Sequence, residues 1–345
     1  MSSPYDGLPP SAFWKSAVSD RAPLDPGALY APRFAVTRAM RIVTAGSCFA
    51  QHIGRNLRHA GFRITDAEPL PDVVPEGLAN DHGYRLYSAR YGNIYTTAQL
   101  AQLYEEANGR LTPADPVWEK AGRFYDAQRP GLDPGGLDSP EQVLRHRAHH
   151  LTRVKAAFDS ADLFVFTLGL TEAWVHKASG TVYPTAPGTI AGQFDPDTYA
   201  FKNYDVTEVL DALRSFMKRL RKVNRRVRFL FTVSPVPLTA TASGQHVEVA
   251  TAYSKATLRA VCGKLYADDP GVDYFPSYEL ITSANNRGVY FEPNKRSVSP
   301  AGVAQAMKLF FDAHQVEAKS PSRPAPDDDE AELRCEEALL EGFAR

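Results

Sequence analysis

Short apolar runs alternate with long helical patterns along this chain, and that alternation restricts the fold more than any other feature. The runs 162–168 and 227–233 are rich in Phe, Val and Leu, have strand length, and each follow a long helical segment. Between them, apolar residues recur at helical spacing from Val206 to Leu220. Repeats of this kind predict parallel strands joined by crossover helices. We therefore expect an α/β fold in which helices cover a parallel sheet.

A third apolar run, 40–44, leads into the small residues 45–50 and then into a helical pattern. This order predicts a strand, a tight turn and a helix. In open α/β sheets, ligands and nucleophiles lie at the carboxyl ends of strands, where neighbouring crossover helices diverge. Ser47 and Cys48 fall in this turn, and we expect their backbone N–H groups at the helix N-terminus, where an oxyanion is stabilised. The turn thus offers a nucleophile together with part of its stabiliser.

The turn sequence Gly46-Ser47-Cys48-Phe49-Ala50 is similar to the signature of the GSCFA family, which resembles a branch of the SGNH/GDSL hydrolase superfamily. Further blocks resemble that family in the same order, and they begin at Ser88, Thr167, Ser234 and Phe275. The resemblance implies a flavodoxin-like three-layer α/β/α sandwich with a parallel sheet. It also implies an esterase or O-acyltransferase that acts on ester bonds of a glycan-like or other small acylated substrate.

The resemblance gives Cys48 and Ser47 different places. In SGNH-type enzymes the nucleophile follows Gly-Asp in the first block, so a gapless comparison puts Cys48 at the nucleophile position and Ser47 at that of the Asp. A thiolate is intrinsically more nucleophilic than an alcohol, and a helix N-terminus lowers the pKa of a thiol. The alternative is that Cys48 is a small buried hydrophobe, as free cysteines often are. Ser47 is then the other candidate nucleophile.

Two further blocks resemble the oxyanion-binding parts of the superfamily. Gly92 with Asn93 resembles the second block, whose glycine N–H joins the oxyanion hole there. Gly169 to Glu172 resembles the third block, Gly-x-Asn-Asp/Glu, with Thr171 in place of the Asn. Because a threonine hydroxyl lacks the reach of a carboxamide, Asn93 is the candidate side-chain donor. The alternatives are that Asn93 closes a turn and that Glu172 caps the next helix.

The last block departs from the superfamily, whose members carry an Asp and a His there, separated by two residues. This chain has Asn294 and Ser297 instead, and neither acts as a general base near neutral pH. We expect both to line the cleft and to orient loops or substrate. The first substitute for the base is His246, which follows the block 234–237, and the second is His82. The alternative for His246 is a surface or helix-capping role.

We expect no cofactor and no metal. His146 and His150 share a helix face, but Arg145 and Arg147 beside them repel a cation and no strong third ligand is near in sequence. The glycine-containing stretch 131–136 lacks the Lys-Ser/Thr pair of a phosphate-binding loop. The predicted chemistry therefore depends on protein side chains alone.

Charge and cysteine usage restrict partners and compartment. The net charge of −1 gives no general attraction to nucleic acid or to an anionic membrane, so we expect neither as a partner. The basic cluster from Lys218 to Arg228 is interpreted as the solvated end of a helix. The 3 cysteines are odd in number and far apart, which argues against a disulfide framework. With no signal-peptide pattern and no long apolar span, the sequence predicts a soluble cytoplasmic protein.

The chain divides into three parts by composition. We expect an N-terminal arm over 1–38, one GSCFA (SGNH-like) α/β domain over 39–315, and a Pro-rich, acidic linker with a short C-terminal helix over 316–345. That helix docks either on its own domain or on a protein partner.

Two functions follow from the sequence. The first is acyl transfer or hydrolysis, and the second is a non-catalytic binding or scaffold protein that has lost the usual Asp/His dyad. A Cys48 thiol that faces a histidine across an open cleft would favour the enzyme, whereas burial without a histidine would favour the scaffold.

Overall fold

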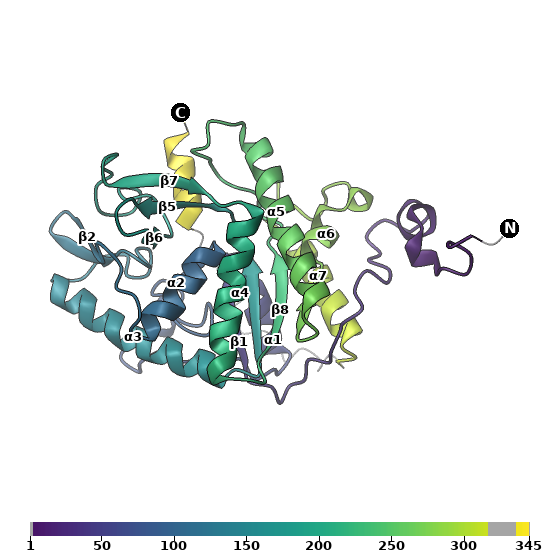
Figure 1. The fold of residues 1–345 in the computed structure, drawn as a ribbon, viewed down its shortest axis with the longest axis horizontal. Helices are drawn as coiled ribbons and strands as arrows, with labels where there is room; N and C mark the ends of the chain where they lie inside the picture. The colour runs from purple at the N-terminus through teal and green to yellow at the C-terminus, as the bar shows by residue number, and fades with distance from the viewer. Residues whose placement is uncertain (1–2, 317–335, 345) are drawn as a thin grey trace.

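A parallel sheet of four strands forms the centre of the protein, in the order β1-β4-β8-β9 (Figure 1). The computed structural model describes residues 3–316 and 336–344. The strands are β1 (Ile42–Gly46), β4 (Leu163–Leu168), β8 (Arg228–Val233) and β9 (Val272–Tyr274). Every pair is parallel, and in the register Ile42 lies opposite Leu163, which lies opposite Arg228. The three runs predicted as strands are thus neighbours in this sheet.

The edge beside β1 carries one further bridge. Ile64 forms an isolated parallel bridge with Ile42, and the Ile42 N–H donates to the Arg63 carbonyl at 2.9 Å. The Thr65 N–H donates to the Ile42 carbonyl at 2.8 Å. With this position counted as a second strand, the order in space is the 2-1-3-4-5 order of flavodoxin-like sheets.

Helices cover both faces of the sheet. On one face, helices α2 to α5 enclose an aromatic cluster in which Phe158 and Phe216 pack on Phe164 of β4. On the other face, α1, α6 and α7 form a second cluster that includes Phe49 and Phe310. The helices are α1 (Phe49–His59), α2 (Thr97–Ala107), α3 (Pro140–Ser160), α4 (Val206–Val223), α5 (Val247–Asp268), α6 (Ser277–Thr282) and α7 (Pro300–Ala313). These layers confirm the predicted α/β/α sandwich.

Helix α4 shows how local sequence fixes an element. Asp205 accepts a hydrogen bond from the Glu208 N–H, and Glu208 accepts one from the Asp205 N–H, both at 2.9 Å. This reciprocal capping box satisfies donors that a helix N-terminus otherwise leaves unpaired. The predicted apolar stripe then faces the sheet, with these residues buried: Val209, Leu213, Phe216, Met217 and Leu220.

Two small antiparallel sheets accompany the parallel sheet. Strand β2 (Val117–Lys120) pairs with β3 (Arg123–Asp126), and β5 (Glu172–His176) lies between β6 (Val182–Tyr183) and β7 (Tyr199–Asn203). Only residues 169–171 separate β4 from β5. The three-stranded sheet therefore begins at the carboxyl edge of the parallel sheet, which is the edge where the predicted nucleophile lies.

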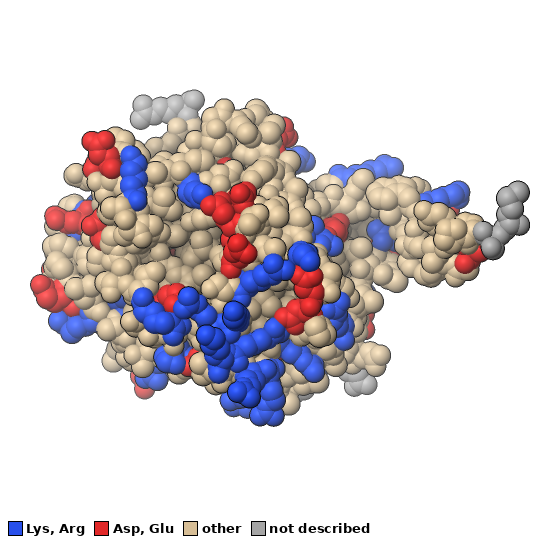
Figure 2. Space-filling view, in the orientation of Figure 1, with Lys and Arg blue, Asp and Glu red and all other residues tan. Residues whose placement is uncertain are grey.

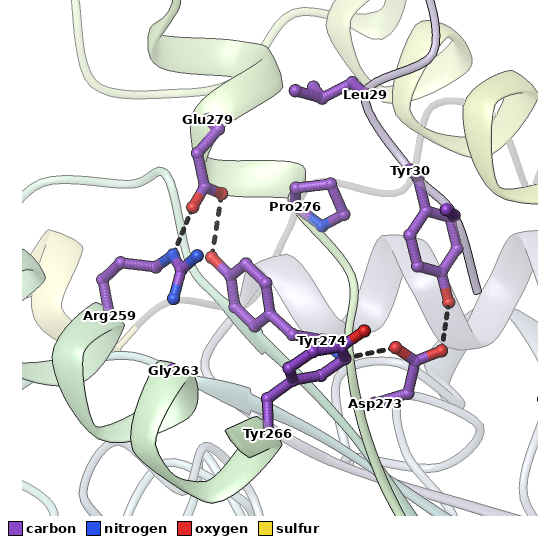
Figure 3. Close-up of a pocket in the computed structure, with 10 residues that line it drawn as sticks. Leu29, Tyr30, Arg259, Gly263, Tyr266, Asp273, Tyr274, Pro276 and Glu279 are labelled. Atoms are coloured by element: carbon purple, nitrogen blue, oxygen red, sulfur yellow. Dashed lines mark hydrogen bonds and ion pairs between the residues drawn. The ribbon is translucent and has the colours of Figure 1, made fainter. Parts of the chain in front are cut away.

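The N-terminal arm contains the short helices η1 (Pro10–Ala12) and η2 (Lys15–Ser19) and projects from the domain (Figure 1). It is fixed at Tyr30, whose hydroxyl donates to the buried Asp273 at 2.9 Å (Figure 3). The Arg33 N–H donates to the same carboxylate at 3.0 Å. Trp14 is 71% exposed, whereas Tyr30 is buried and Phe34 packs against the core, so these two aromatic residues hold the arm.

The basic cluster from Lys218 to Arg228 spans the end of α4 and the start of β8, and basic side chains gather at the lower centre of the face in Figure 2. Because β8 starts there, this patch lies at the opposite edge of the sheet from the turn after β1. Several of its members form ion pairs, among them Arg219 with Glu105 at 2.8 Å. Among the described residues, no helix is both long and apolar enough to cross a membrane.

Acid should destabilise the fold through His52 of α1. Burial, with a smaller contribution from Arg55, lowers the pKa of His52 to about 4 from 6.5. The unfolded chain then binds more protons than the folded one between these values, so stability falls as the pH drops from about 6.5 to about 4. We expect His52→Leu to remove about 2 kcal/mol of this loss. Urea unfolding measures the free energy of unfolding at pH 7 and at pH 4.5, with His59→Leu at an exposed position as the control. An equal loss of free energy between the two pH values in both variants would contradict the prediction.

The C-terminal helix η5 (Glu336–Phe343) contributes little to the core. Leu340 lines a cavity with Trp174, but Leu339 and Phe343 are exposed. The preceding linker lies outside the described residues. We expect truncation after residue 317 to change Tm by less than about 2 °C, because the described residues of η5 bury little apolar surface. A thermal melt that falls by more than about 5 °C would show that this segment belongs to the core.

Candidate functional site

The turn between β1 and α1 is held by main-chain hydrogen bonds on two sides. The Ser47 N–H donates to the Thr167 carbonyl of β4 at 3.1 Å. The Ile94 N–H donates to the Gly46 carbonyl at 2.9 Å, which brings the block around Gly92 and Asn93 to the turn. Gly46 has φ +139°, and a Cβ there would lie 2.4 Å from the Thr167 carbonyl oxygen. Only glycine fits this close approach.

Ser47 and Cys48 line one small cavity at the carboxyl edge of the sheet. Each is only 3% exposed, and Cys48 is the N-cap residue of α1. The cavity measures about 10 Å³, which is near the space of a single water molecule. Its other lining residues come from three of the blocks noted in the sequence and are Tyr95, Gly169, Leu170, Ser234 and Val236. The fold thus brings these distant blocks together around the predicted nucleophiles.

The two candidate nucleophiles have different surroundings. The Ser47 Oγ is buried and has no hydrogen-bond partner among the described residues, which is uncommon for a buried hydroxyl. Cys48 is buried and belongs to an apolar cluster with Phe49, Val236 and Phe275. Cys48 therefore meets both sequence interpretations, because it borders the cavity and also packs in the core.

Asn93 is buried and held by several hydrogen bonds. Its side-chain oxygen accepts from the Tyr87 hydroxyl and from Gln51 Nε2 at 3.4 Å, and its backbone carbonyl accepts from Gln99 Nε2 at 2.9 Å. Gly92 before it has φ +68°, a left-handed conformation that glycine adopts without strain. This network fixes the carboxamide in one orientation beside the turn.

Helix α5 places a buried lysine against the same loop. Lys255 is 1% exposed, and its Nζ donates to the Gly169 carbonyl at 2.7 Å. Gly169 packs directly on the nucleophile turn, because a Cβ on it would lie 2.8 Å from Ser47 Cβ. Sequence reasoning missed Lys255, although it lies three residues before Leu258 and seven before Cys262, on the apolar stripe of α5. A lysine on a buried stripe is the signal that would have found it.

Comparison with known proteins is clear at the level of the family. The sequence model of the GSCFA family matches residues 41–310, which is more than half of the chain. The chain belongs to the GSCFA family. No curated protein matches it. A solved structure described as "a putative platelet activating factor from Streptococcus pneumonia" aligns with 50% of this chain and 67% of its own, at 13% identity and a TM-score of 0.28.

Two residues of the third block lie apart from the small cavity of this GSCFA protein. Thr171 is fully buried, and its N–H donates to Ser254 Oγ of α5 at 3.0 Å. Glu172 begins strand β5 and therefore does not cap a helix. Its carboxylate accepts from the Thr241 hydroxyl at 2.7 Å, and burial raises its pKa. Glu172 lines a second cavity, of about 190 Å³, next to the first.

The predicted base and the last block lie elsewhere. The His246 side chain is 69% exposed, and its Nδ1 accepts from the Glu248 N–H at 3.2 Å, so it caps helix α5. Asn294 is exposed, and its side-chain oxygen accepts from the Ser297 N–H at 2.9 Å in a turn. His246, Asn294 and Ser297 are not among the residues that line the small cavity. The expectation that Asn294 and Ser297 line the cleft therefore fails for this cavity.

The other histidines also have structural surroundings. His150 is buried, and its Nδ1 lies 2.7 Å from the Glu68 carboxylate, while His82 lies 3.5 Å from Asp133. In residues 3–316 and 336–344, no group of three or more His, Cys, Asp or Glu side chains is placed to hold a metal ion.

A larger cavity, of about 290 Å³, lies where the arm meets α5 and α6. In Figure 3, Arg259 and Tyr274 both point to the Glu279 carboxylate, and Tyr30 points to Asp273. Arg259 and Glu279 form an ion pair, the two tyrosine hydroxyls donate to carboxylates, and burial raises the pKa of Asp273. Leu29, Tyr30 and Ala31 form one wall of the cavity, which therefore lies at the contact between the N-terminal arm and the domain.

Proposed function

We propose that this GSCFA protein is an SGNH-like acyl-ester hydrolase or O-acyltransferase with Cys48 as nucleophile and Ser47 beside it. One observation carries the proposal: Ser47 and Cys48 directly precede α1 and line a cavity whose wall residue Gly169 accepts a hydrogen bond from the buried Lys255 Nζ. The substrate is a small acylated molecule, glycan-like in the simplest case, and the chemistry needs neither a metal nor a cofactor.

In the proposed reaction, the Cys48 thiolate attacks the acyl carbonyl carbon. The tetrahedral oxyanion is stabilised by backbone N–H groups at the start of α1. Gly92 and Asn93 are not among the residues that line the small cavity, and their part is to hold the loop whose Ile94 N–H binds the turn. Its collapse forms a thioester on Cys48 and breaks the ester C–O bond, and the alkoxide leaves as the alcohol after it takes a proton from solvent. Water or a second hydroxyl then attacks the thioester and gives a proton to solvent, so the thiolate is freed and the acyl group leaves as the acid or as a new ester. The choice between water and a second hydroxyl decides between hydrolase and transferase.

In this proposal, Lys255 and not His246 activates the Cys48 thiol. A positive charge near a thiol favours the thiolate, which then needs no neighbouring histidine to remove its proton. The ammonium is directed to the Gly169 carbonyl, on the wall shared with Ser47 and Cys48. This proposal gives Lys255 an electrostatic role and leaves His246 as a helix cap.

A non-catalytic binding or scaffold protein is the second candidate. The burial of Ser47 and Cys48 favours it, as does a small cavity whose lining contains no histidine in the described part of the chain. In this closed arrangement the cavity holds no more than about one water, so substrate entry requires movement of residues that line it.

Acylation of the nucleophile distinguishes the two functions. With p-nitrophenyl acetate, we expect a burst of product and an acetyl group on the peptide containing Cys48, found by mass spectrometry. Cys48→Ala should lower the rate by at least about 100-fold. Cys262→Ala, which removes a buried thiol of α5, is the matched control and should leave the rate within about twofold. Equal rates in Cys48→Ala and Cys262→Ala, without acylation of Cys48 or Ser47, would favour the scaffold.

A further inference from the structure

A second cavity shares one lining residue with the nucleophile cavity. Leu170 lines both the space of about 10 Å³ beside Ser47 and Cys48 and the neighbouring space of about 190 Å³. We name the larger space the Trp174 cavity. It lies between β5, β7, the segment 238–242 and the C-terminal helix η5, and it is lined mainly by Leu170, Ala173, Trp174, Phe201, Leu238 and Leu340.

The walls of the Trp174 cavity suit an uncharged apolar group. Trp174 is held edge-on by Phe194 and Phe201, with ring centroids 5.1 and 5.9 Å away, so the indole is a fixed wall. Glu172 is the ionisable group of the lining, and its carboxylate accepts a hydrogen bond from Thr241. A carboxylate in the wall repels an anionic ligand, while the apolar walls gain free energy when they are covered.

The size of the Trp174 cavity restricts the group that it can hold. Leu340 of η5 supplies one wall and adds to its apolar character. The volume of about 190 Å³ is below the range of roughly 300–1,000 Å³ that is usual for pockets of drug-sized ligands. The space therefore fits a short aliphatic chain better than a long lipid chain or a sugar ring with many hydroxyl groups.

We propose that the Trp174 cavity binds the short aliphatic acyl group of the substrate while the ester carbonyl lies beside Cys48. The identity of the ligand as an acyl group rests on the proposed function, whereas the affinity of the cavity for a short apolar chain rests on its walls alone. Leu170 then lies at the junction, where the carbonyl carbon joins the chain.

The acyl-chain preference of ester hydrolysis tests the proposal. We compare p-nitrophenyl acetate, butyrate, hexanoate and decanoate on the full chain, and we expect kcat/KM to be highest for butyrate or hexanoate. Ala173→Phe fills the cavity and should lower the hexanoate value at least tenfold while the acetate value changes by less than threefold. Ala178→Phe, at an exposed position after β5, is the matched control and should leave the profile unchanged.

A binding measurement separates this proposal from the proposed function. Hexanamide is an uncharged probe that cannot be hydrolysed as an ester, and its binding should change the fluorescence of Trp174 in the wild type but not in Trp174→Phe. If hexanamide binds but no ester is hydrolysed, the Trp174 cavity is supported as an apolar binding site and the proposed function is overturned. Hydrolysis with the same chain-length profile in Ala173→Phe and Ala178→Phe, or no hexanamide signal from Trp174, would overturn the Trp174 cavity as the acyl site. If Ala173→Phe does not fold, Trp174→Ala replaces it and should move the preference to longer chains.

Discussion

Gly46→Ala is expected to cost about 2–6 kcal/mol of folding free energy, because it combines backbone strain with a clash. At φ +139° an alanine is strained, and its Cβ would lie 2.4 Å from the Thr167 carbonyl oxygen and 2.8 Å from the Thr167 nitrogen. Those atoms belong to β4 at the centre of the sheet, so they cannot move without breaking strand pairing. Urea unfolding followed by circular dichroism measures the loss.

A matched glycine separates strain from collision. Gly180 has φ +73°, and a Cβ there would have nothing within 4 Å. Gly180→Ala should therefore lower the free energy of unfolding only by the strain of an alanine at positive φ, about 1–2 kcal/mol. If the two alanine variants lose the same free energy of unfolding, a clash between residue 46 and β4 does not contribute to the loss.

Under the proposed function, Lys255→Met is expected to slow alkylation of Cys48 by iodoacetamide at pH 7 at least tenfold, because it removes the positive charge proposed to favour the thiolate. The midpoint of the labelling rate against pH should also move upward, which a purely structural role of Lys255 would not produce. Cys262 gives the internal reference, since burial raises the pKa of its thiol. Peptide mass spectrometry assigns each modified cysteine.

His246→Ala is the matched control for this experiment, because it removes the base that the sequence favoured. His246 is exposed and caps α5, so its loss should leave the labelling of Cys48 unchanged within about twofold. Slower labelling in His246→Ala with no change in Lys255→Met would reverse the two assignments and restore a Cys–His pair. Circular dichroism of both variants checks that the fold is intact.

The layers of the fold were predictable because they follow from local periodicity. The strands β1, β4 and β8 are continuous apolar runs. The apolar stripe of α4 has helical spacing, so each buried face can be recognised within a short stretch of sequence. The three-stranded sheet was not predicted. Its strand β5 carries Trp174 and His176 in a half-buried pattern that has no long apolar run. Such a segment gives little signal by which a strand is told from a loop.

The site was predictable where it depends on chain order and not where it depends on side-chain direction. The turn at Ser47 and the block at Ser234 lie at carboxyl ends of parallel strands, so topology alone brings them together. The position of His246 is fixed by the start of helix α5, because its ring accepts a hydrogen bond from the Glu248 N–H. Asn294 likewise closes a turn with Ser297. These local hydrogen bonds hold the side chains of His246 and Asn294 away from the cavity. The spacing of residues in the sequence does not reveal such bonds.

The main-chain anchoring of the turn has a consequence for how this protein can change. Ser47 and Ile94 bind the turn through their N–H groups, and Gly46 and Thr167 accept through their carbonyls. No side-chain atom of residue 47 or 48 takes part in these bonds, so the path of the main chain at the turn does not depend on a hydrogen bond from either side chain. Because both side chains are only 3% exposed, mutation can exchange uncharged groups of similar size there, such as a hydroxyl and a thiol, while the main-chain bonds stay the same. Chemistry at this turn can diversify faster than the fold that presents it.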